Sequence, residues 1–556
     1  MKKFISVFIA ITLILSLVCV APVSFAEDEK RVKFALATDL HIEKVAKTLP
    51  VSYPESELYF HASGSGNLYN EATGITLSFL SKAEKENVDF ILIPGDLTRS
   101  GTKTEHEYVA KMLCDFSERT GIKIFAVPGN HDYMSSTAPD SFKKYYSTLC
   151  YENALVTDSE TASYTADLPN DFRLIAVDSN NPGKDGDGLT ERLFSWTDEQ
   201  VKSAKADGKE VIFMMHHTVL EHLYLGSILM KDFIVRNHRE VAERFCDWGI
   251  QYVFTGHEHG NDIAKYEGGN GNVLYDVLTT SLTSYPLEFR VISYGKSGVD
   301  IKMQSIDECD FSNLISGYNE KQLSLMESDY DAYAKGYFNY SIEKKILKYV
   351  SPEFINSKLK AENTPLSAAV DSLMSLVCQA LQMPLYGEEN SIEALAERYG
   401  VSIPESEYNS VLSLAVSLVA MHYYGDENLD LSSSAEGEIL IKGLNTALEY
   451  ILCNAESETE KALIRLSLGY FAPDSGKIDE WLTSFEDGSE ESYEIAEEII
   501  RPFLQKYASD TAPADRDVTL PAFGEKVSPL NRFFGIVEKI INFVEYILGI
   551  VFRFVK

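Results

Sequence analysis

Between residues 32 and 255 the chain repeats one pattern, a short apolar run followed at once by a polar or glycine-containing turn. Runs this short, bounded by turn residues, favour buried strands. The segments 74–86 and 104–119 carry apolar residues at helical spacing. Strands that alternate with helices predict a layered α/β domain. The runs lie at 32–38, 90–94, 122–127, 172–177, 211–215 and 252–255.

Five of these runs end directly at side chains that bind metals in proteins. Open α/β sheets place ligand sites in the crevice beyond the carboxyl ends of their strands. Separate strands can therefore deliver their terminal residues to one place. The candidate metal ligands are Asp39, His41, Asp96, Asn130, His216, His257 and His259.

The residue types and their spacing indicate which metals would bind. Imidazole and carboxylate together suit manganese, iron, cobalt or zinc, whereas calcium calls for oxygen ligands almost throughout. Seven ligands exceed the needs of one tetrahedral ion and suit two ions that share a bridging carboxylate. Asp39 and His41, like His257 and His259, are two residues apart and would face the same way in extended backbone. Tight turns beside the ligands are permitted by Gly95, Gly129 and Gly256.

The ordered blocks resemble the calcineurin-like metallophosphoesterase superfamily. They are Asp-x-His at 39–41, Gly-Asp at 95–96, Gly-Asn-His-Asp at 129–132, His at 216 and Gly-His-x-His at 256–259. The resemblance covers about 30–303 and implies a four-layer α/β/β/α sandwich. The segment 95–101 is similar to the cyclic-nucleotide and glycerophosphodiester phosphodiesterase group. Purple acid phosphatases place a metal-binding tyrosine where this chain has Arg99.

The resemblance also implies a role for each site residue. One metal would be held by Asp39, His41 and His259, and the other by Asn130, His216 and His257, with Asp96 bridging both. The cofactors would be two divalent or trivalent transition-metal ions, Mn, Fe or Zn, and a hydroxide held between them would attack phosphorus in line.

Three neighbouring side chains complete this expectation. The catalytic residue would be His131, which would stabilise the phosphoryl oxygens or protonate the departing oxygen. The resemblance implies His216 and not His217 as the ligand, because the family's ligand directly follows its strand. Asp132 has two open roles, orienting His131 or fixing the turn.

The start of the chain predicts export. Residues 1–26 combine two lysines, a long apolar run and a Ser-x-Ala site, which is typical of a cleaved signal peptide. We therefore expect a secreted protein, with a cell-surface or membrane-associated location as the alternative. The formal net charge of −34 argues against binding a nucleic-acid duplex. It leaves room for a small phosphate-ester substrate, because bound cations reverse the local field.

The spacing of apolar residues changes along the chain and divides it into further segments. We expect a catalytic domain at 30–305, finished by antiparallel strands at 273–278, 289–294 and 299–303. Helical spacing then predicts an all-α accessory domain at 320–506, in which His422 is a packed core residue. A linker at 507–529 leads to an amphipathic C-terminal helix at 530–556. That helix would either dock onto the protein or lie on a membrane surface.

The function that the resemblance and the export signal together imply is a secreted metal-dependent phosphodiesterase. The alternatives are a phosphomonoesterase of the acid-phosphatase kind and a non-catalytic surface-binding protein that keeps the fold. A complete ligand set and an intact His131 disfavour the last of these. Aromatic residues in the loop at 43–73 would stack on a substrate or merely pack the loop.

Overall fold

A computed structural model describes residues 30–521 of the chain. The described range excludes 44–64, 136, 182–186, 224–225, 227–231, 310–317, 319, 360–364, 388, 426–433, 469–474, 488–490 and 509–512. The predicted signal peptide at 1–26 and the predicted amphipathic helix at 530–556 lie outside the described residues. Among the helices that the structure describes, none is long and apolar enough to cross a lipid bilayer.

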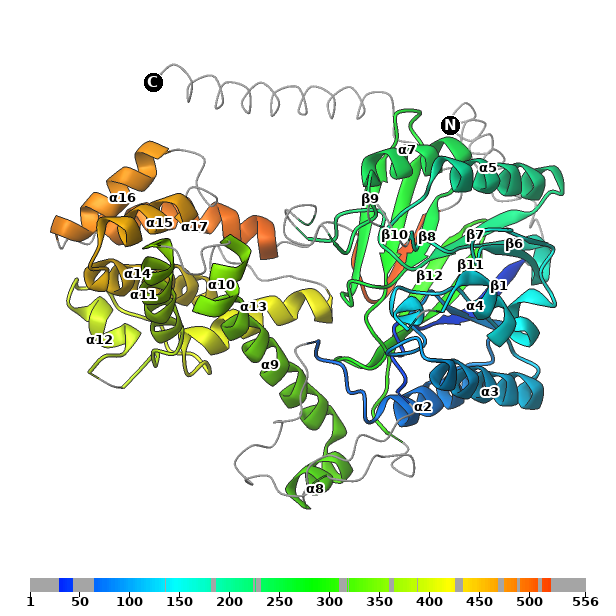
Figure 1. The fold of residues 1–556 in the computed structure, drawn as a ribbon, viewed down its shortest axis with the longest axis horizontal. Coiled ribbons are helices and arrows are strands. Elements are labelled where there is room, and N and C mark those ends of the chain that lie inside the picture. The colour runs from blue at the N-terminus through cyan, green and yellow to red at the C-terminus, as the bar shows by residue number, and fades with distance from the viewer. Residues whose placement is uncertain are drawn as a thin grey trace, which may run out of the picture.

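Two mixed β-sheets form the first part of the described chain (Figure 1). The first sheet contains, in spatial order, β13 (Val518–Leu520), β12 (Gly298–Ser305), β11 (Glu288–Gly295), β1 (Arg31–Leu36), β2 (Phe90–Ile93) and β3 (Lys123–Ala126). The second contains β4 (Val156–Thr157), β5 (Tyr164–Leu168), β6 (Phe172–Val177), β7 (Glu210–Met215), β8 (Tyr252–Thr255), β10 (Val273–Leu278) and β9 (Asp262–Glu267).

The predicted strands all occur, and the three that finish the domain each pair antiparallel with a neighbour, although they lie in two different sheets. The strands β11 and β12 form the expected antiparallel hairpin. By contrast, β10 lies in the other sheet, parallel to β8 and antiparallel to β9. The sequence pattern did not separate the sheets, because a short, mostly apolar run can enter either one.

The two sheets share one hydrophobic core. Phe34 on β1 stacks on Phe90 of the same sheet, with 5.1 Å between ring centroids. It also meets Phe254 on β8 of the second sheet edge to face at 5.4 Å. All three rings are buried. The sheets therefore pack face to face through aromatic side chains.

Helices flank this pair of sheets (Figure 1). Their bounds are α2 (Ala72–Lys85), α3 (Lys103–Thr120), α4 (Pro139–Tyr145), α5 (Glu191–Ala206) and α7 (His238–Trp248). The start of α3 is fixed by a capping box, in which the Thr102 side chain accepts from Glu105 N and the Glu105 side chain accepts from Thr102 N. Gly121 ends the helix in the left-handed conformation that a helix terminus favours.

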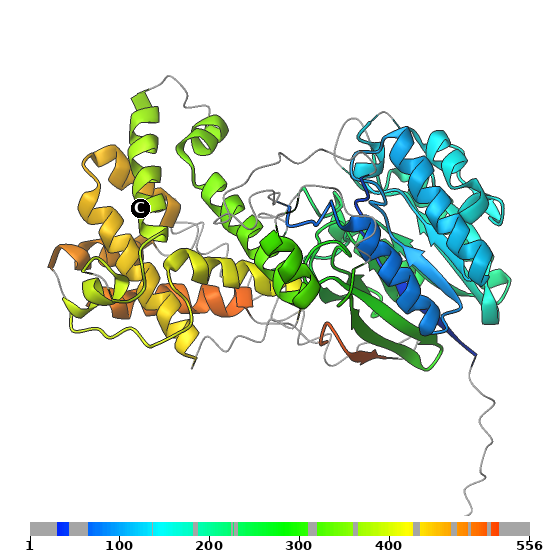
Figure 2. The same ribbon diagram turned by 90° about the horizontal axis from the view of Figure 1, so that it is seen from below.

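The second part of the described chain, the helical region at 320–508, is almost entirely α-helical. It lies beside the sheets in both views (Figure 1, Figure 2). Its helices are α8 (Glu320–Ser328), α9 (Tyr330–Tyr349), α10 (Pro352–Leu359), α11 (Pro365–Leu381), α12 (Ile392–Glu397), α13 (Val411–Tyr424), α14 (Ala435–Asn454), α15 (Glu458–Leu468), α16 (Ser475–Asp487) and α17 (Glu491–Ala508).

The chain returns to the first sheet after the helical region. Val518–Leu520 lies within the segment predicted as a linker, yet it forms β13 and pairs antiparallel with β12. The register places Val299 opposite Leu520 and Ile301 opposite Val518. The helical region is therefore connected at both ends to the edge of one sheet.

Candidate metal centre

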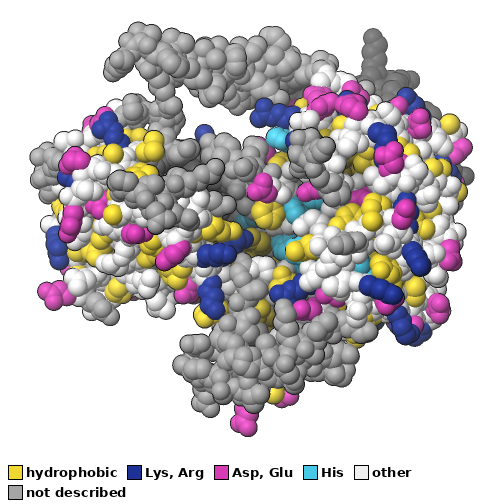
Figure 3. All heavy atoms as spheres, in the orientation of Figure 1, with side chains coloured by type: hydrophobic (Ala, Val, Ile, Leu, Met, Phe, Trp, Pro, Cys, Tyr) yellow, Lys and Arg dark blue, Asp and Glu magenta, His cyan; other side chains and the backbone are white. Residues whose placement is uncertain are grey.

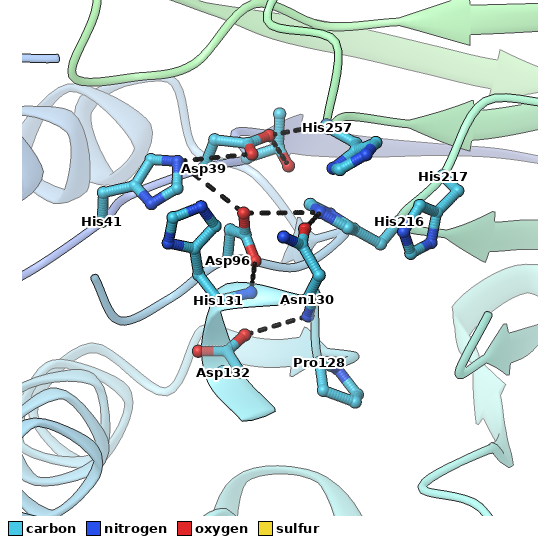
Figure 4. A network of polar contacts seen from close by, with 12 residues as sticks. Asp39, His41, Asp96, Pro128, Asn130, His131, Asp132, His216, His217 and His257 are labelled. Carbon is cyan, nitrogen blue, oxygen red and sulfur yellow. Dashed lines mark hydrogen bonds and ion pairs between the residues drawn. The ribbon is translucent and has the colours of Figure 1, made fainter. Parts of the chain in front are cut away.

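The carboxyl ends of β1, β2, β3, β7 and β8 bring together the side chains predicted as metal ligands (Figure 4). Three groups have donor atoms that all lie within 4.8 Å of one another. They are Asp39 with His41 and His259, His41 with Asp96 and His131, and Asp96 with His216 and His257.

The first group joins residues that are far apart in the sequence. His41 Nε2 lies 3.2 Å from His259 Nε2, and His259 Nε2 lies 3.1 Å from Asp39 Oδ1. The other oxygen of Asp39 accepts a hydrogen bond of 3.0 Å from His257 N and one of 2.7 Å from Thr38 Oγ1. One carboxylate oxygen is thus held by the protein while the other faces the two imidazoles.

Asp96 lies between the two sides of the site. Its Oδ2 is 3.7 Å from His41 Nε2 and 3.5 Å from His216 Nε2. Its Oδ1 accepts from His131 N at 2.8 Å. On the far side, His216 Nε2 lies 3.2 Å from Asn130 Oδ1, and His216 Nδ1 donates to Pro94 O at 2.8 Å. This placement suits a carboxylate that bridges two cations.

The backbone at five of the seven candidate ligands is left-handed, so the extended geometry expected for Asp39 with His41 and for His257 with His259 was wrong. The φ angles are 54° at Asp39, 46° at His41, 50° at Asp96, 72° at His257 and 65° at His259. Non-glycine residues in this region cost of order 1–3 kcal/mol each and persist where surrounding contacts fix them. Two of those contacts join neighbouring turns, from Asp39 N to Gly95 O at 3.1 Å and from His41 N to Asp96 O at 2.9 Å.

The three glycines beside the ligands are explained by close approach. A Cβ at Gly129 would lie 2.1 Å from Asp96 Oδ1, and one at Gly256 would lie 2.5 Å from Asp39 Oδ2. A Cβ at Gly95 would lie 2.3 Å from His216 Nδ1, and its φ of +107° also favours glycine. Each glycine therefore makes room for a neighbouring ligand side chain.

Burial and charge set the protonation of the site. Burial lowers the pKa of His41 to about 3, and burial with the nearby His217 and His216 holds that of His257 well below its usual value. Burial opposes ionisation of Asp39, but His259 keeps its pKa below the usual range. Neutral imidazoles and ionised carboxylates are the forms that bind metals.

His216 differs from the other histidines. Burial lowers its pKa, but the Asp96 carboxylate more than compensates and raises it to about 9. A metal bound there would replace that proton. With this proton removed, the buried nitrogen and oxygen donors fit a pair of transition-metal cations better than calcium, which favours oxygen ligands.

His131 is half-buried at the edge of the centre. Its Nδ1 donates to Arg99 O at 2.7 Å, which leaves Nε2 as the second ring nitrogen. Its ring centroid is 4.6 Å from that of His41. Its nitrogen is therefore close enough to join His41 and Asp96 as a metal donor or to act on a substrate beside them.

The contacts of Asp132 support a role in fixing the turn and not in orienting His131. Its carboxylate accepts hydrogen bonds from Thr98 N at 2.9 Å, Gly129 N at 3.0 Å and Leu97 N at 3.1 Å. These contacts fix the two turns that carry Asp96 and Asn130. The Asp132 carboxylate therefore binds backbone N–H groups. The His131 ring is oriented by its hydrogen bond to Arg99 O and not by Asp132.

The ring nitrogens of His217 have partners outside the donor groups, although the ring packs against His257 with 4.3 Å between centroids. Its Nδ1 lies 2.7 Å from Ser179 Oγ, and its Nε2 lies 3.4 Å from Asp187 Oδ2. Only His216 of this adjacent pair belongs to a donor group.

Residues beside His41 make contacts with one another that the sequence analysis did not predict. The Arg99 guanidinium lies 3.8 Å from the centroid of the Tyr69 ring and pairs with Glu43. The Tyr69 ring meets the His41 ring edge to face at 6.0 Å. The aromatic residues expected at Tyr53 and Tyr59 lie outside the described residues. Figure 3 shows histidine side chains on the face where the two parts of the molecule meet.

Comparison with known proteins defines the class to which this centre belongs. Residues 32–261 match the calcineurin-like phosphoesterase family. This part of the chain is a calcineurin-like metallophosphoesterase domain, a class with a dinuclear metal centre, and the predicted resemblance is confirmed.

A curated relative is similar to part of the chain. The chain is 26% identical over 180 residues to a probable glycerophosphodiester phosphodiesterase, GpdQ, from Arcobacter nitrofigilis. The match covers 32% of this chain and 58% of that protein, which is less than two thirds of its length.

Two solved structures are also similar in part. A dimetal phosphatase from Danio rerio matches with a TM-score of 0.38 and 13% identity, over 52% of this chain and 100% of that one. The purple acid phosphatase PPD1 from yellow lupin seeds matches with a TM-score of 0.33 and 11% identity, over 50% of this chain and 52% of that one.

Proposed function

We propose that this protein is a phosphodiesterase that uses two transition-metal ions, Mn, Fe or Zn. The observation that carries the proposal is the meeting of donor groups from five strand ends around Asp96. One ion would be held by Asp39, His41 and His259, the other by Asn130, His216 and His257, and Asp96 would contact both. When bound, such a pair supplies charge stabilisation for phosphoryl oxygens and an activated water.

The chain's own residues would orient the ester and move a proton. His131 is held by its Nδ1 hydrogen bond to Arg99 O, which leaves Nε2 as the nitrogen that would act on a bound ester. From there it would stabilise a phosphoryl oxygen or protonate the departing alcohol. Arg99 and Tyr69 would form the wall of the site next to His41.

The preference for diesters is supported by the relative named a glycerophosphodiester phosphodiesterase. Arg99 stands where purple acid phosphatases carry a metal-binding tyrosine, which disfavours an iron–tyrosinate pair but does not bear on the ester preferred. A phosphomonoesterase is the alternative activity, and the test below separates the two.

The test is hydrolysis of bis(4-nitrophenyl) phosphate and 4-nitrophenyl phosphate by metal-stripped protein reloaded with manganese, zinc or iron. We expect metal-dependent turnover with the higher kcat/KM for the diester, lost in Asp96→Ala. A higher kcat/KM for the monoester would overturn the diester proposal. Absence of turnover with any metal, although two ions are bound, would overturn the enzymatic role.

We also propose the finer organisation of the chain. Residues 30–305 would form a four-layer α/β/β/α sandwich, joined to a helical accessory domain at 320–506 and a linker at 507–529. Residues 1–26 would direct export and be removed, which determination of the mature N-terminus would test. Residues 530–556 would form an amphipathic helix, and liposome binding that is unchanged by their deletion would exclude a membrane role.

A further inference from the structure

The helical region reaches the turn that carries two of the candidate ligands. This turn follows β8 and contains His257, Glu258 and His259. The Glu258 side chain points away from the donor groups and toward α13, where its Oε1 lies 3.3 Å from His422 Nε2. Both side chains are almost fully buried, at 4% and 5% exposure respectively.

The fit between α13 and this turn is close. A Cβ at Gly260 would lie 2.7 Å from His422 Nε2, so any larger residue there would displace the histidine ring. Asn261 N donates to His422 O at 3.3 Å. A Cβ at Gly425, at the end of α13, would lie 3.1 Å from Asn261 Cβ. Contacts from two sides thus hold the segment that follows the ligand histidines.

A charged pair next to α13 reinforces this contact. Arg516 donates to Tyr424 O at 2.7 Å and to Glu288 Oε2 at 2.9 Å. Asn261 Nδ2 donates to the same Glu288 oxygen at 3.3 Å. The end of α13, the segment after the ligand turn and the chain returning toward β13 therefore share one polar network.

The ligand turn needs such support because its backbone is strained. His257 and His259 have φ angles of 72° and 65°, and Glu258 N closes a tight turn by donating to Gly256 O at 2.8 Å. A turn of this kind persists only when its surroundings fix it. Glu258 is the one residue between the two ligands, so anchoring its side chain restricts both neighbours.

We propose that His422 is a positioning residue for the metal centre, through which the helical region holds His257 and His259 in the geometry that binds metal. The inference rests on the proposed function, because it takes those two histidines as ligands. Removal of His422 would leave a buried carboxylate without this partner. The turn would relax to expose that carboxylate to water and would carry the ligand histidines with it.

The experiment measures binding of Mn²⁺ to the metal-stripped full chain, together with the visible spectrum of the Co²⁺-loaded protein. The variants are His422→Ala, His422→Gln, His422→Phe and Glu258→Gln, together with the double variant Glu258→Gln/His422→Phe. Glutamine keeps an N–H close to the position of His422 Nε2. The matched control is His238→Ala, which removes a histidine at the start of α7, away from this contact.

We expect His422→Ala to weaken Mn²⁺ binding by about tenfold or more, the lower range for a residue that orients a metal ligand. Its Co²⁺ spectrum should change, whereas His422→Gln and His238→Ala should stay near the native values. If His422→Ala fails to fold, a double-mutant cycle between Glu258→Gln and His422→Phe, which fills the space of the ring without its nitrogens, decides, and coupling is the expected result. Native affinity in His422→Ala, or no coupling in the cycle, would overturn the proposal.

These readouts separate the inference from the function on which it rests. Native protein that binds two Mn²⁺ ions without hydrolysing any ester would contradict the phosphodiesterase and leave the His422 result standing. Normal diester hydrolysis with unchanged metal binding in His422→Ala would contradict the inference alone.

Discussion

Among the glycines of the metal centre, Gly129 is the one at which an added Cβ would come closest to a ligand. The substitution Gly129→Ala is therefore the most direct test of the geometry of the centre. A Cβ at Gly129 would lie 2.1 Å from Asp96 Oδ1, whereas ordinary contacts begin near 3.4 Å. To regain ordinary contact the carboxylate would move by about 1.3 Å, the difference between 3.4 and 2.1, and the Asp96 backbone N, 2.5 Å from the same Cβ, would have to shift as well. Because a misplacement of about 1 Å can lower a rate about 100-fold, we expect kcat/KM for the diester to fall by about that factor. This corresponds to about 2.7 kcal/mol of transition-state stabilisation.

The assay compares kcat/KM at saturating Mn²⁺ in Gly129→Ala and in Gly443→Ala. Gly443 lies in α14, where the nearest atom to an added Cβ is 4.0 Å away, so this control should keep native activity. Circular dichroism and thermal unfolding would establish that both variants are folded. Native kcat/KM in a folded Gly129→Ala would refute the reasoning, because it would mean that Asp96 can shift without consequence.

Three further predictions concern single side chains. His131→Ala should lower kcat by about 10²–10⁴-fold and keep both bound ions, and loss of an ion would identify it as a ligand. His216→Ala should lose one ion, measured by metal analysis, whereas His217→Ala should keep both; equal loss would contradict the assignment. Burial raises the pKa of Glu71, which accepts from Tyr333 on α9 at 3.0 Å. The folded protein therefore favours protonated Glu71. The free energy of unfolding should fall as the pH rises above 4.5, the ordinary pKa of a glutamate side chain. Glu71→Gln should therefore raise Tm more at pH 8 than at pH 4, and an equal shift at both would falsify this.

The convergence of the site could be predicted because it follows from a local pattern and a general rule. Each apolar run predicts a strand, and each strand carries its terminal residue to the same end of a parallel pair. Asp96 and His216 are 120 positions apart in the numbering, yet both follow strands directly, so their meeting needed no knowledge of pairwise contacts. The roles assigned to these ligands stay predictions until metal is bound and measured.

Other features depend on contacts that a single sequence does not reveal. β13 has three residues, too few for an alternating pattern to identify. His422 is buried, as its apolar helix suggested, but its contact with Glu258 joins segments that no local pattern relates. The left-handed backbone at His257 and His259 was also unforeseen, because such strain is set by the surrounding structure.

The return of the chain to β12 affects how the protein can be made and divided. During synthesis β12 is complete long before residues 518–520 emerge, so for that interval it is an open sheet edge able to pair with other chains. A fragment that stops at Ser305 would keep this edge exposed permanently and would be prone to aggregate. An isolated phosphoesterase domain should therefore carry residues 513–521 fused after Ser305, so that its own strand covers the edge that the full chain covers last.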